Sequence, residues 1–160
     1  MTARPAVYME IETIRWPGAE LLAELSRYEH EAFGPTGLRS FDLALVAWTG
    51  RLYAGRVDGH LAAGCQLVRI LDRPHMVWVV GFYVRPAWQR LGLGRRMLEH
   101  VVADLPTIGA RGIELTVVPE NSRALHLYFS AGFQHVGEVP EMYGPEEHRV
   151  MLRYEREEAQ

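Results

Sequence analysis

A strand, a short loop and a helix follow one another between Val84 and Leu98, where the sequence reads VRPAWQRLGLGRRML. An apolar run over residues 77–84 predicts the strand, and the apolar residues from Leu91 to Leu105 recur at helical spacing. The two glycines of the loop would let a ligand approach the backbone at the start of this helix. Amide groups there have no helical partners and the helix dipole is positive, so the loop favours an anion such as a phosphate or pyrophosphate. A tight turn that binds nothing is the alternative.

The spacing of the glycines distinguishes this loop from other phosphate-binding loops. Met97 stands where a dinucleotide-binding G-x-G-x-x-G motif requires its third glycine, and no G-K-[ST] follows as in a nucleotide P-loop. The order Gln89-x-x-Gly92-x-Gly94 instead resembles the coenzyme A pyrophosphate loop of the GNAT N-acetyltransferase superfamily. The resemblance implies that a run of consecutive residues binds the pyrophosphate: Gln89, Arg90, Leu91, Gly92, Leu93, Gly94 and Arg95.

Length and composition fit one globular domain. The chain has 160 residues, of which 48% are hydrophobic and 23% charged, so a single domain over residues 1–160 is expected. The net charge of −3 argues against a nucleic-acid partner. No apolar run reaches the roughly 18 residues of a membrane span, and the N-terminus lacks a signal-peptide pattern. Cys65 is the only cysteine, which excludes an intrachain disulfide. We therefore expect a cytoplasmic protein without a membrane partner.

The hydrophobic patterns follow the order strand, two helices, three strands, helix, strand, helix, two strands. Asp58-Gly59 predicts a tight hairpin turn, and Ser40 and Asn121 are expected N-caps of helices. This order predicts an α+β fold with a mixed, mostly antiparallel sheet of about six to seven strands and about four helices. It is also the element order of the GNAT fold. The expected strands cover 7–15, 51–57, 60–70, 77–84, 113–118, 133–139 and 148–154, the helices 21–33, 40–47, 91–105 and 121–131, and a frayed tail 155–160.

A second segment, from Val118 to Phe133, carries a more specific signal. It reads VPENSRALHLYFSAGF and resembles N-x-x-A-x-x-x-Y-x-x-x-G-F, the second signature of the same superfamily. The matching residues are Asn121, Ala124, Tyr128, Gly132 and Phe133. With both motifs and the element order in agreement, the chain is identified as a member of the GNAT superfamily.

The resemblance implies an acetyl-CoA-dependent N-acetyltransferase that moves the acetyl group directly to a primary amine and uses no metal ion. The fourth and fifth strands would separate at their C-terminal ends, and pantetheine would bind there along the backbone of Phe82 and Val84. Gly81 is expected to mark a close approach of another group to this strand. Asn121 would contact the pantetheine or the substrate, and the Val84 amide would stabilise the oxyanion. Tyr128 would protonate the departing thiolate, with packing of its ring into the core as the alternative.

The general base is the weakest part of this assignment. Many relatives place a carboxylate on the fourth strand, but residues 75–84 contain none. His75 is one candidate by its side-chain type, and a solvated turn histidine is the alternative. Glu114 is a second candidate, although we expect it to face the surface. An α-amine with a pKa of about 8 would need no base, whereas a lysine amine would need more help.

The acceptor site of the family is built from the first helices, the loop before the fourth strand and the last hairpin. Residues 142–151 faintly resemble the ribosomal-protein-alanine N-acetyltransferase branch, although Arg149 departs from it, so a protein N-terminus is placed slightly ahead of a small amine. A CoA-binding regulatory module without catalysis and a structural domain without CoA are the alternatives. A homodimer through an exposed sheet edge at the last strand also remains open. The residues expected around the acceptor are Glu29, Glu31, Phe33, Trp48, Tyr83, Glu138, Glu141, Tyr143, Glu146 and His148.

Overall fold

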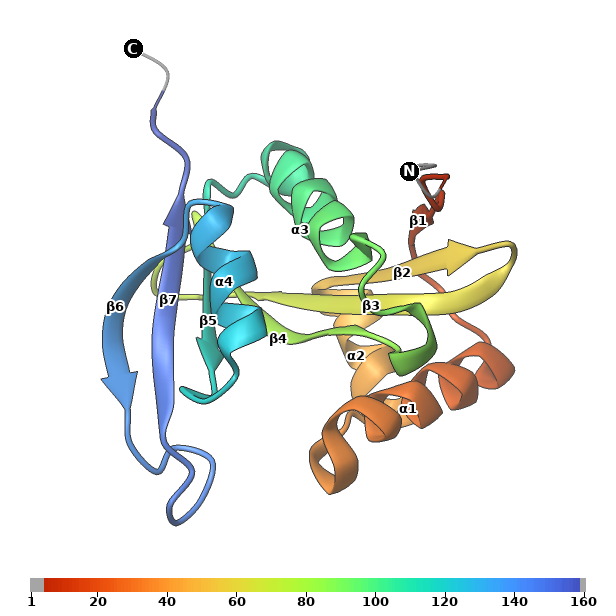
Figure 1. Ribbon diagram of the computed structural model, residues 1–160, viewed down its shortest axis with the longest axis horizontal. Coiled ribbons are helices and arrows are strands. Elements are labelled where there is room, and N and C mark those ends of the chain that lie inside the picture. The colour runs from red at the N-terminus through yellow and green to blue at the C-terminus, as the bar shows by residue number, and fades with distance from the viewer. Residues whose placement is uncertain (1–4, 159–160) are drawn as a thin grey trace. The chain divides into compact units, whose positions relative to one another are not determined.

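Residues 5–158 are described by the computed structural model of the chain, and they contain seven strands and four α-helices (Figure 1). None of the helices in this range is long and apolar enough to cross a membrane. The strands are β1 (Glu10–Thr13), β2 (Arg51–Val57), β3 (His60–Arg69), β4 (Met76–Val84), β5 (Gly112–Val117), β6 (Gln134–Val139) and β7 (Arg149–Glu155). The helices are α1 (Ala19–Phe33), α2 (Ser40–Thr49), α3 (Leu93–Asp104) and α4 (Ser122–Ser130).

The strands form one sheet in the order β1-β2-β3-β4-β5-β7-β6. β4 and β5 pair in parallel, while β1 with β2, β2 with β3, and β7 with both β5 and β6 pair antiparallel. The prediction of an α+β fold with a mixed, mostly antiparallel sheet is therefore confirmed. The prediction that the last strand forms a sheet edge is wrong, because β7 lies between β5 and β6 and the edge strand is β6.

The chain divides into two compact units, of which the first combines the chain up to Val68 with Gly81–His100. Its core joins α1 and α2 to one face of β2 and β3 through seven buried residues: Ile14, Leu25, Leu43, Ala47, Leu52, Ala54 and Leu61. Tyr53 alternates with its neighbours and points to the opposite face, where its ring meets that of His100 on α3 at 5.6 Å. The helices of this unit thus cover both faces of the β2–β3 hairpin (Figure 1).

The predicted hairpin turn of the first unit is confirmed. Asp58 and Gly59 both adopt positive φ angles, of 49° and 81°, as a tight two-residue turn requires. The prediction that Ser40 is the N-cap of α2 is wrong, because the cap lies one residue earlier in the chain. Arg39 is the cap residue, and its amide donates to Asp42 Oδ2 at 3.0 Å, which leaves Ser40 as the first helical residue.

The second unit contains residues 69–80 and the chain from Val101 onward. β7 pairs with β5 from Gly112↔Glu155 to Val117↔Val150, and α4 packs beside this ribbon through a chain of rings. Tyr128 of α4 lies 5.2 Å from Phe133, and Phe133 lies 5.6 Å from Tyr154 of β7.

The tail predicted to fray over residues 155–160 makes contacts within the second unit. Glu155 is still part of β7, the Arg156 amide donates to the Arg111 carbonyl at 2.8 Å, and Glu158 pairs with the Arg111 guanidinium. Residues 159–160 lie outside the described part of the chain. The prediction of one domain over residues 1–160 stays a prediction.

Candidate functional site

Hydrogen bonds between neighbouring residues hold the conformation of the loop between β4 and α3. Residues Pro86–Trp88 form one turn of 3-10 helix, and the Trp88 amide donates to the Arg85 carbonyl at 2.9 Å. Gln89 then folds back, and its Nε2 donates to the Val84 carbonyl at 2.9 Å. The glutamine of the first motif therefore holds the loop against the end of β4. Whether it also contacts a cofactor stays a prediction.

The start of α3 has the backbone geometry of an anion site. Arg90 and Gly92 adopt positive φ angles of 64° and 77°, and α3 begins directly afterwards at Leu93. Leu93 is buried and anchors this turn, and the Arg96 amide makes a bond to the Gly92 carbonyl at 3.3 Å. The first turn of a helix brings several amide donors and a positive dipole to one point, which suits a phosphate group.

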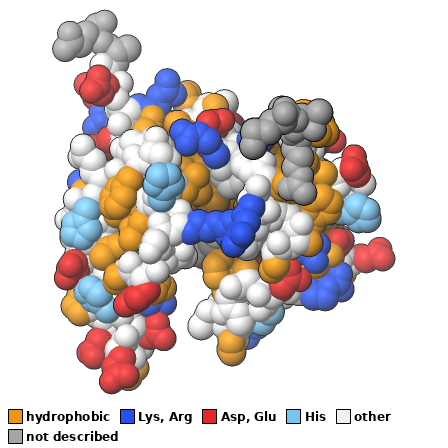
Figure 2. Space-filling model, in the orientation of Figure 1, with side chains coloured by type: hydrophobic (Ala, Val, Ile, Leu, Met, Phe, Trp, Pro, Cys, Tyr) orange, Lys and Arg blue, Asp and Glu red, His pale blue; other side chains and the backbone are white. Residues whose placement is uncertain are grey.

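Arginine side chains strengthen the positive potential of the molecule locally, although the net charge is −3. They gather in the middle of the face drawn in Figure 2. Arg95 follows the loop directly and pairs with Glu99 one turn later at 3.3 Å, with both side chains largely exposed. Such an exposed pair contributes little to stability, so Arg95 could exchange this partner for an anionic ligand at little cost.

The C-terminal half of β4 carries the other predicted cofactor contacts of this unit. Phe82 and Val84 are both half-buried. The close approach predicted at Gly81 is confirmed, because a Cβ at this position would lie 2.5 Å from Gln66 Oε1 of β3. The backbone of this strand segment therefore lies against a polar side chain on one face.

The second motif is placed in the second unit, at the start and in the body of α4. Asn121 is the N-cap, as predicted, and its Oδ1 accepts from the Ala124 amide at 3.2 Å. Tyr128 is buried and its ring packs on Phe133, so the core reading of this tyrosine is correct for its ring. The role of its hydroxyl in proton transfer stays a prediction.

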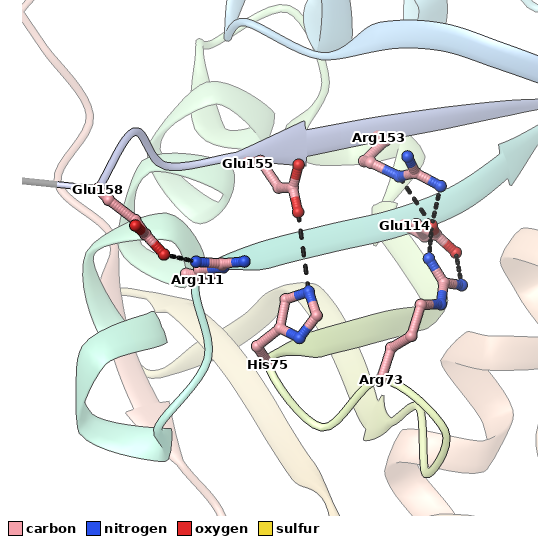
Figure 3. Close-up of polar contacts among 7 residues, drawn as sticks. All are labelled: Arg73, His75, Arg111, Glu114, Arg153, Glu155 and Glu158. Atoms are coloured by element: carbon pink, nitrogen blue, oxygen red, sulfur yellow. Dashed lines mark hydrogen bonds and ion pairs between the residues drawn. The ribbon is translucent and has the colours of Figure 1, made fainter.

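The sequence predicts that Glu114 faces the surface. This prediction is wrong, because Glu114 lies in β5 and is only 1% exposed. Its Oε1 and Oε2 accept from the Arg73 guanidinium at 2.5 and 2.8 Å, and Oε1 also accepts from Arg153 Nε at 2.8 Å (Figure 3). The hydrogen bonds from Arg73, and then those from Arg153, hold the pKa of Glu114 below its usual range. A carboxylate in this setting is a poor general base, because it gives up its two cationic partners on protonation.

His75, the other candidate base, precedes β4 and is partly exposed. Its Nε2 lies 3.8 Å from Glu155 Oε1 (Figure 3). Its carbonyl accepts hydrogen bonds from the Arg111 and Gly112 amides at 2.9 and 3.2 Å, so its backbone is tied to the start of β5. This places His75 at the opposite end of β4 from Val84, as its position in the sequence predicts.

A carboxyl group with the properties of a base lies elsewhere, on α1. Glu29 is 1% exposed, and burial raises its pKa from the ordinary 4.5 to about 7, against smaller opposing effects of hydrogen bonds from Leu38 and Gln66. Gln66 Nε2 donates to Glu29 Oε1 at 2.5 Å, and the Leu38 amide lies 3.5 Å from Glu29 Oε2. The sequence analysis named Glu29 only as one of ten acceptor-site candidates and did not single out Gln66.

Both residues carried a signal in the sequence. Glu29 stands one helical turn after the buried Leu25, on the apolar stripe of α1, where a carboxylate is unexpected. Gln66 is the one polar residue between Leu61 and Val68 in an otherwise apolar or small run. A polar residue at a core position predicts a polar partner at another core position.

The residues predicted around the acceptor divide between the two units. In the first unit Phe33 meets the ring of Tyr83 at 6.0 Å, and Glu31 pairs with Arg85 at 3.2 Å, so these lie near Glu29 at the end of α1. Trp48 does not join them, because its ring packs on Trp16 at 5.9 Å.

In the second unit the polar residues of the last hairpin contact one another. Tyr143 and Thr116 share a hydroxyl contact at 3.1 Å, and Glu138 lies 3.6 Å from His148. Glu146 and Glu141 are joined by a longer contact, from the Glu146 amide to Glu141 Oε1 at 3.5 Å.

The family model of the Acetyltransferase (GNAT) family matches residues 13–133, which is most of the chain. This chain is a member of the GNAT family. The matched range contains both motifs and the whole β4–α3 loop, so the superfamily resemblance described from the sequence is confirmed.

Several named proteins and solved structures are similar to this chain. A [ribosomal protein bS18]-alanine N-acetyltransferase of Salmonella typhimurium is 34% identical over 105 residues, which are 66% of this chain and 62% of that protein. The crystal structure of the ribosomal-protein-S18-alanine N-acetyltransferase from Escherichia coli has a TM-score of 0.75 at 23% identity, with 96% of this chain and 97% of that one covered.

A third comparison concerns the cofactor. A Salmonella typhimurium structure with its cofactor acetyl-CoA has a TM-score of 0.76 at 16% identity and covers 96% of both chains. The sequence match to the Salmonella alanine N-acetyltransferase spans less than two thirds of that relative. The structural similarities, at under 25% identity, establish the GNAT fold.

Proposed function

We propose that this GNAT chain transfers an acetyl group from acetyl-CoA to a primary amine. The observation that carries the proposal is the β4–α3 loop, where two positive φ angles precede the start of α3 within the matched family segment, a geometry that suits an anion. The pyrophosphate of CoA would bind the amides of residues 90–95. The chemistry supplied by the co-substrate is its thioester, whose carbonyl carbon the amine attacks.

The chain's own groups have distinct tasks in this reaction. The Val84 amide at the end of β4 would donate to the oxyanion, and Phe82 and Val84 would hold the pantetheine through their backbone. Asn121 Oδ1 is already used by the cap, so a contact to the ligand would use its Nδ2 donor. Tyr128 would give its hydroxyl proton to the departing thiolate.

For the acceptor, we favour the amino terminus of a protein, with a small amine such as a polyamine, an aminoglycoside or an amino acid as the second candidate. The support is that similar proteins are named as ribosomal-protein-S18-alanine N-acetyltransferases. Two carboxyl groups, of Glu29 and Glu31, lie near the end of α1 and could receive a positively charged amine. We place the enzyme in the cytoplasm.

Ligand-dependent unfolding tests the cofactor half of this proposal. Acetyl-CoA and CoA should each raise the unfolding temperature, whereas ATP and NAD should not, because only the two CoA species carry the pantetheine that would bind along the backbone of Phe82 and Val84. A ligand at about 100 times its Kd adds about 2.7 kcal/mol to the folded state. No shift with millimolar acetyl-CoA would remove the enzyme assignment and leave a GNAT fold without its cofactor.

Replacing Tyr128 with Phe tests the catalytic half. Tyr128→Phe should lower kcat by about a hundredfold or more with CoA binding retained, because the thiolate loses its proton donor while the packing on Phe133 is kept. Tyr154→Phe is the matched control, since Tyr154 packs on the same Phe133 ring. Unchanged turnover in Tyr128→Phe would refute the acid role. The parent chain could also bind acetyl-CoA but release no thiol with any N-terminal peptide or small amine. That result would favour the non-catalytic regulatory module, which the absence of a carboxylate on β4 also fits.

A further inference from the structure

A buried polar pair joins α1 to β3 in the first unit. Glu29 and Gln66 are each 1% exposed, and they are linked by the Gln66 Nε2 to Glu29 Oε1 hydrogen bond of 2.5 Å. The other oxygen of Glu29 lies 3.5 Å from the Leu38 amide. We call these two residues the Glu29–Gln66 pair.

The remaining polar atom of the pair lacks a partner. Gln66 Oε1 is buried and accepts no hydrogen bond from any described residue. A buried carbonyl oxygen without a donor loses its hydrogen bond to water and gains none in return, so native proteins rarely keep one without a function or a bound group. This oxygen therefore indicates a missing N–H or O–H donor.

The direction of the oxygen is fixed by its contact with β4. It lies 2.5 Å from the position that a Cβ would take on Gly81, so it occupies the face of β4 where this strand has no side chain. The Phe33 ring reaches within 3.4 Å of the same position and is 38% exposed. A ligand can reach the oxygen only if groups such as this ring move, and the Gly81 position that it faces lies three residues before Val84.

We propose that the Glu29–Gln66 pair receives the amino group of the acceptor, with Gln66 Oε1 as the atom that accepts its N–H hydrogen bond. This rests on the function proposed above and names its amine subsite. Gln66 is the contact residue and Glu29 is a positioning residue, because it determines which end of the Gln66 carboxamide faces Gly81.

The positioning follows from hydrogen-bond donors and acceptors. An ionised Glu29 accepts from Gln66 Nε2, which leaves Oε1 facing Gly81 as an acceptor for an ammonium group. A protonated Glu29 can instead donate to Oε1, and the carboxamide then turns its NH₂ group toward Gly81, where it repels an ammonium group. Protonation of one buried carboxyl therefore turns the amine subsite off.

The groups around Glu29 favour a change of protonation near neutral pH. Burial raises the pKa of Glu29 to about 7. Tyr83 of β4 faces the same region, and burial followed by the charge of Glu29 raises the pKa of its hydroxyl, so it stays neutral there. Cys65 is the neighbour of Gln66 on β3 and points to the opposite face of the strand. His30, the neighbour on α1, is exposed and its Nδ1 contacts the Ser26 carbonyl at 2.7 Å.

Peptide binding as a function of pH tests the proposal without requiring turnover. The probe is a hexapeptide with N-terminal alanine, and the same peptide with an acetylated N-terminus is the ligand control. Calorimetry is run on the protein with and without CoA between pH 6 and 7.5, below the α-amine pKa of about 8. If only the ionised form of the pair binds, the affinity of the free-amine peptide should rise roughly tenfold over this range.

Two variants and one control separate the pair from other titrating groups. Glu29→Gln should bind the peptide with an affinity independent of pH, since Gln cannot ionise, and Gln66→Met should weaken the free-amine peptide about tenfold at pH 7.5 while the CoA affinity is kept. Glu20→Gln is the matched control, because Glu20 is exposed on the same helix. It should retain the full pH dependence.

Kinetics give a second readout. In log–log form, kcat/KM for the peptide should fall below pH 7 with a slope of about two in the parent chain, one proton from the amine and one from Glu29, and about one in Glu29→Gln. An unchanged slope in Glu29→Gln, or Gln66→Met with normal peptide affinity, would overturn the proposal. If the chain binds no CoA, only the proposed function is contradicted. The peptide titration of the CoA-free protein still measures whether the Glu29–Gln66 pair binds the amine.

Discussion

At the scale of single residues, Glu29 couples the stability of the chain to pH. Its pKa is raised from 4.5 to about 7, so between these values the folded state holds a proton that the unfolded state has released. The neutral carboxyl therefore stabilises the fold fully below pH 4.5, and this contribution is lost as the pH rises through 7.

We expect the free energy of unfolding of the parent chain to fall by about 3 kcal/mol between pH 4.5 and 8, relative to Glu29→Gln. The glutamine mimics the protonated carboxyl and has no charge to bury. Urea unfolding at four or five pH values measures the difference. Parallel pH profiles of the two proteins would show that Glu29 does not carry a raised pKa, and Glu20→Gln should give a profile parallel to the parent.

Glu114 has the opposite dependence. The hydrogen bonds from Arg73 and Arg153 lower its pKa, so its stabilising contribution is present at neutral pH and is lost as the pH falls through that lowered value.

Replacing Glu114 with Gln should destabilise the chain by about 2–3 kcal/mol at pH 7, because two guanidinium groups lose their shared carboxylate. Both arginines are partly exposed, so water offsets some of the cost. Glu158→Gln removes an exposed partner of Arg111 and should change stability by less than about 0.5 kcal/mol. Denaturant titration compares the two, and a Glu114→Gln protein as stable as the parent would contradict the buried pairing.

At the scale of elements, the start of α3 and the β2–β3 turn provide a matched pair of glycines. Gly92 and Gly59 adopt similar positive φ angles, of 77° and 81°, and a Cβ would meet no atom within 4 Å at either position. Alanine at each site therefore costs backbone strain of the same kind, about 1 kcal/mol.

Only one of the two should affect cofactor binding. We expect Gly92→Ala to weaken acetyl-CoA about tenfold or more, because the loop would shift and its new methyl group would stand where the pyrophosphate approaches the backbone. Gly59→Ala should lose similar stability but keep its affinity. Calorimetry measures the acetyl-CoA affinity of both variants. Equal affinities would show that the pyrophosphate does not bind at this loop.

The elements that the sequence predicted well are those set by local chemistry. Asp58-Gly59, the cap at Asn121 and the glycines of the β4–α3 loop each act on backbone within a few residues, so their patterns suffice. The burial of two glutamates depends on partners that are distant in the chain. Glu29 bonds to Gln66, 37 residues away. Glu114 bonds to Arg153 and Arg73, which are 39 and 41 residues away. No local pattern contains that information, although the polar residue on each apolar face was visible.

At the scale of the whole molecule, the cationic side chains are of one type. All 17 of the Lys and Arg residues are arginine, so the chain offers no lysine amine to its own acetyl-CoA. Acetyl-lysine found in a reaction mixture must therefore come from the acceptor. A screen for lysine acceptors therefore needs no correction for acetylation of the enzyme's own side chains.

The position of β7 inside the sheet has a consequence for synthesis on the ribosome. The hairpin of β2 and β3 and its helices are complete early in translation, when only the first part of the chain has emerged. β6 pairs with β7, whose residues Arg149–Glu155 are made last among the strands. Until then β5 is the open edge of the sheet and β6 is unpaired. In that interval the nascent chain exposes a strand that another copy or a chaperone could bind.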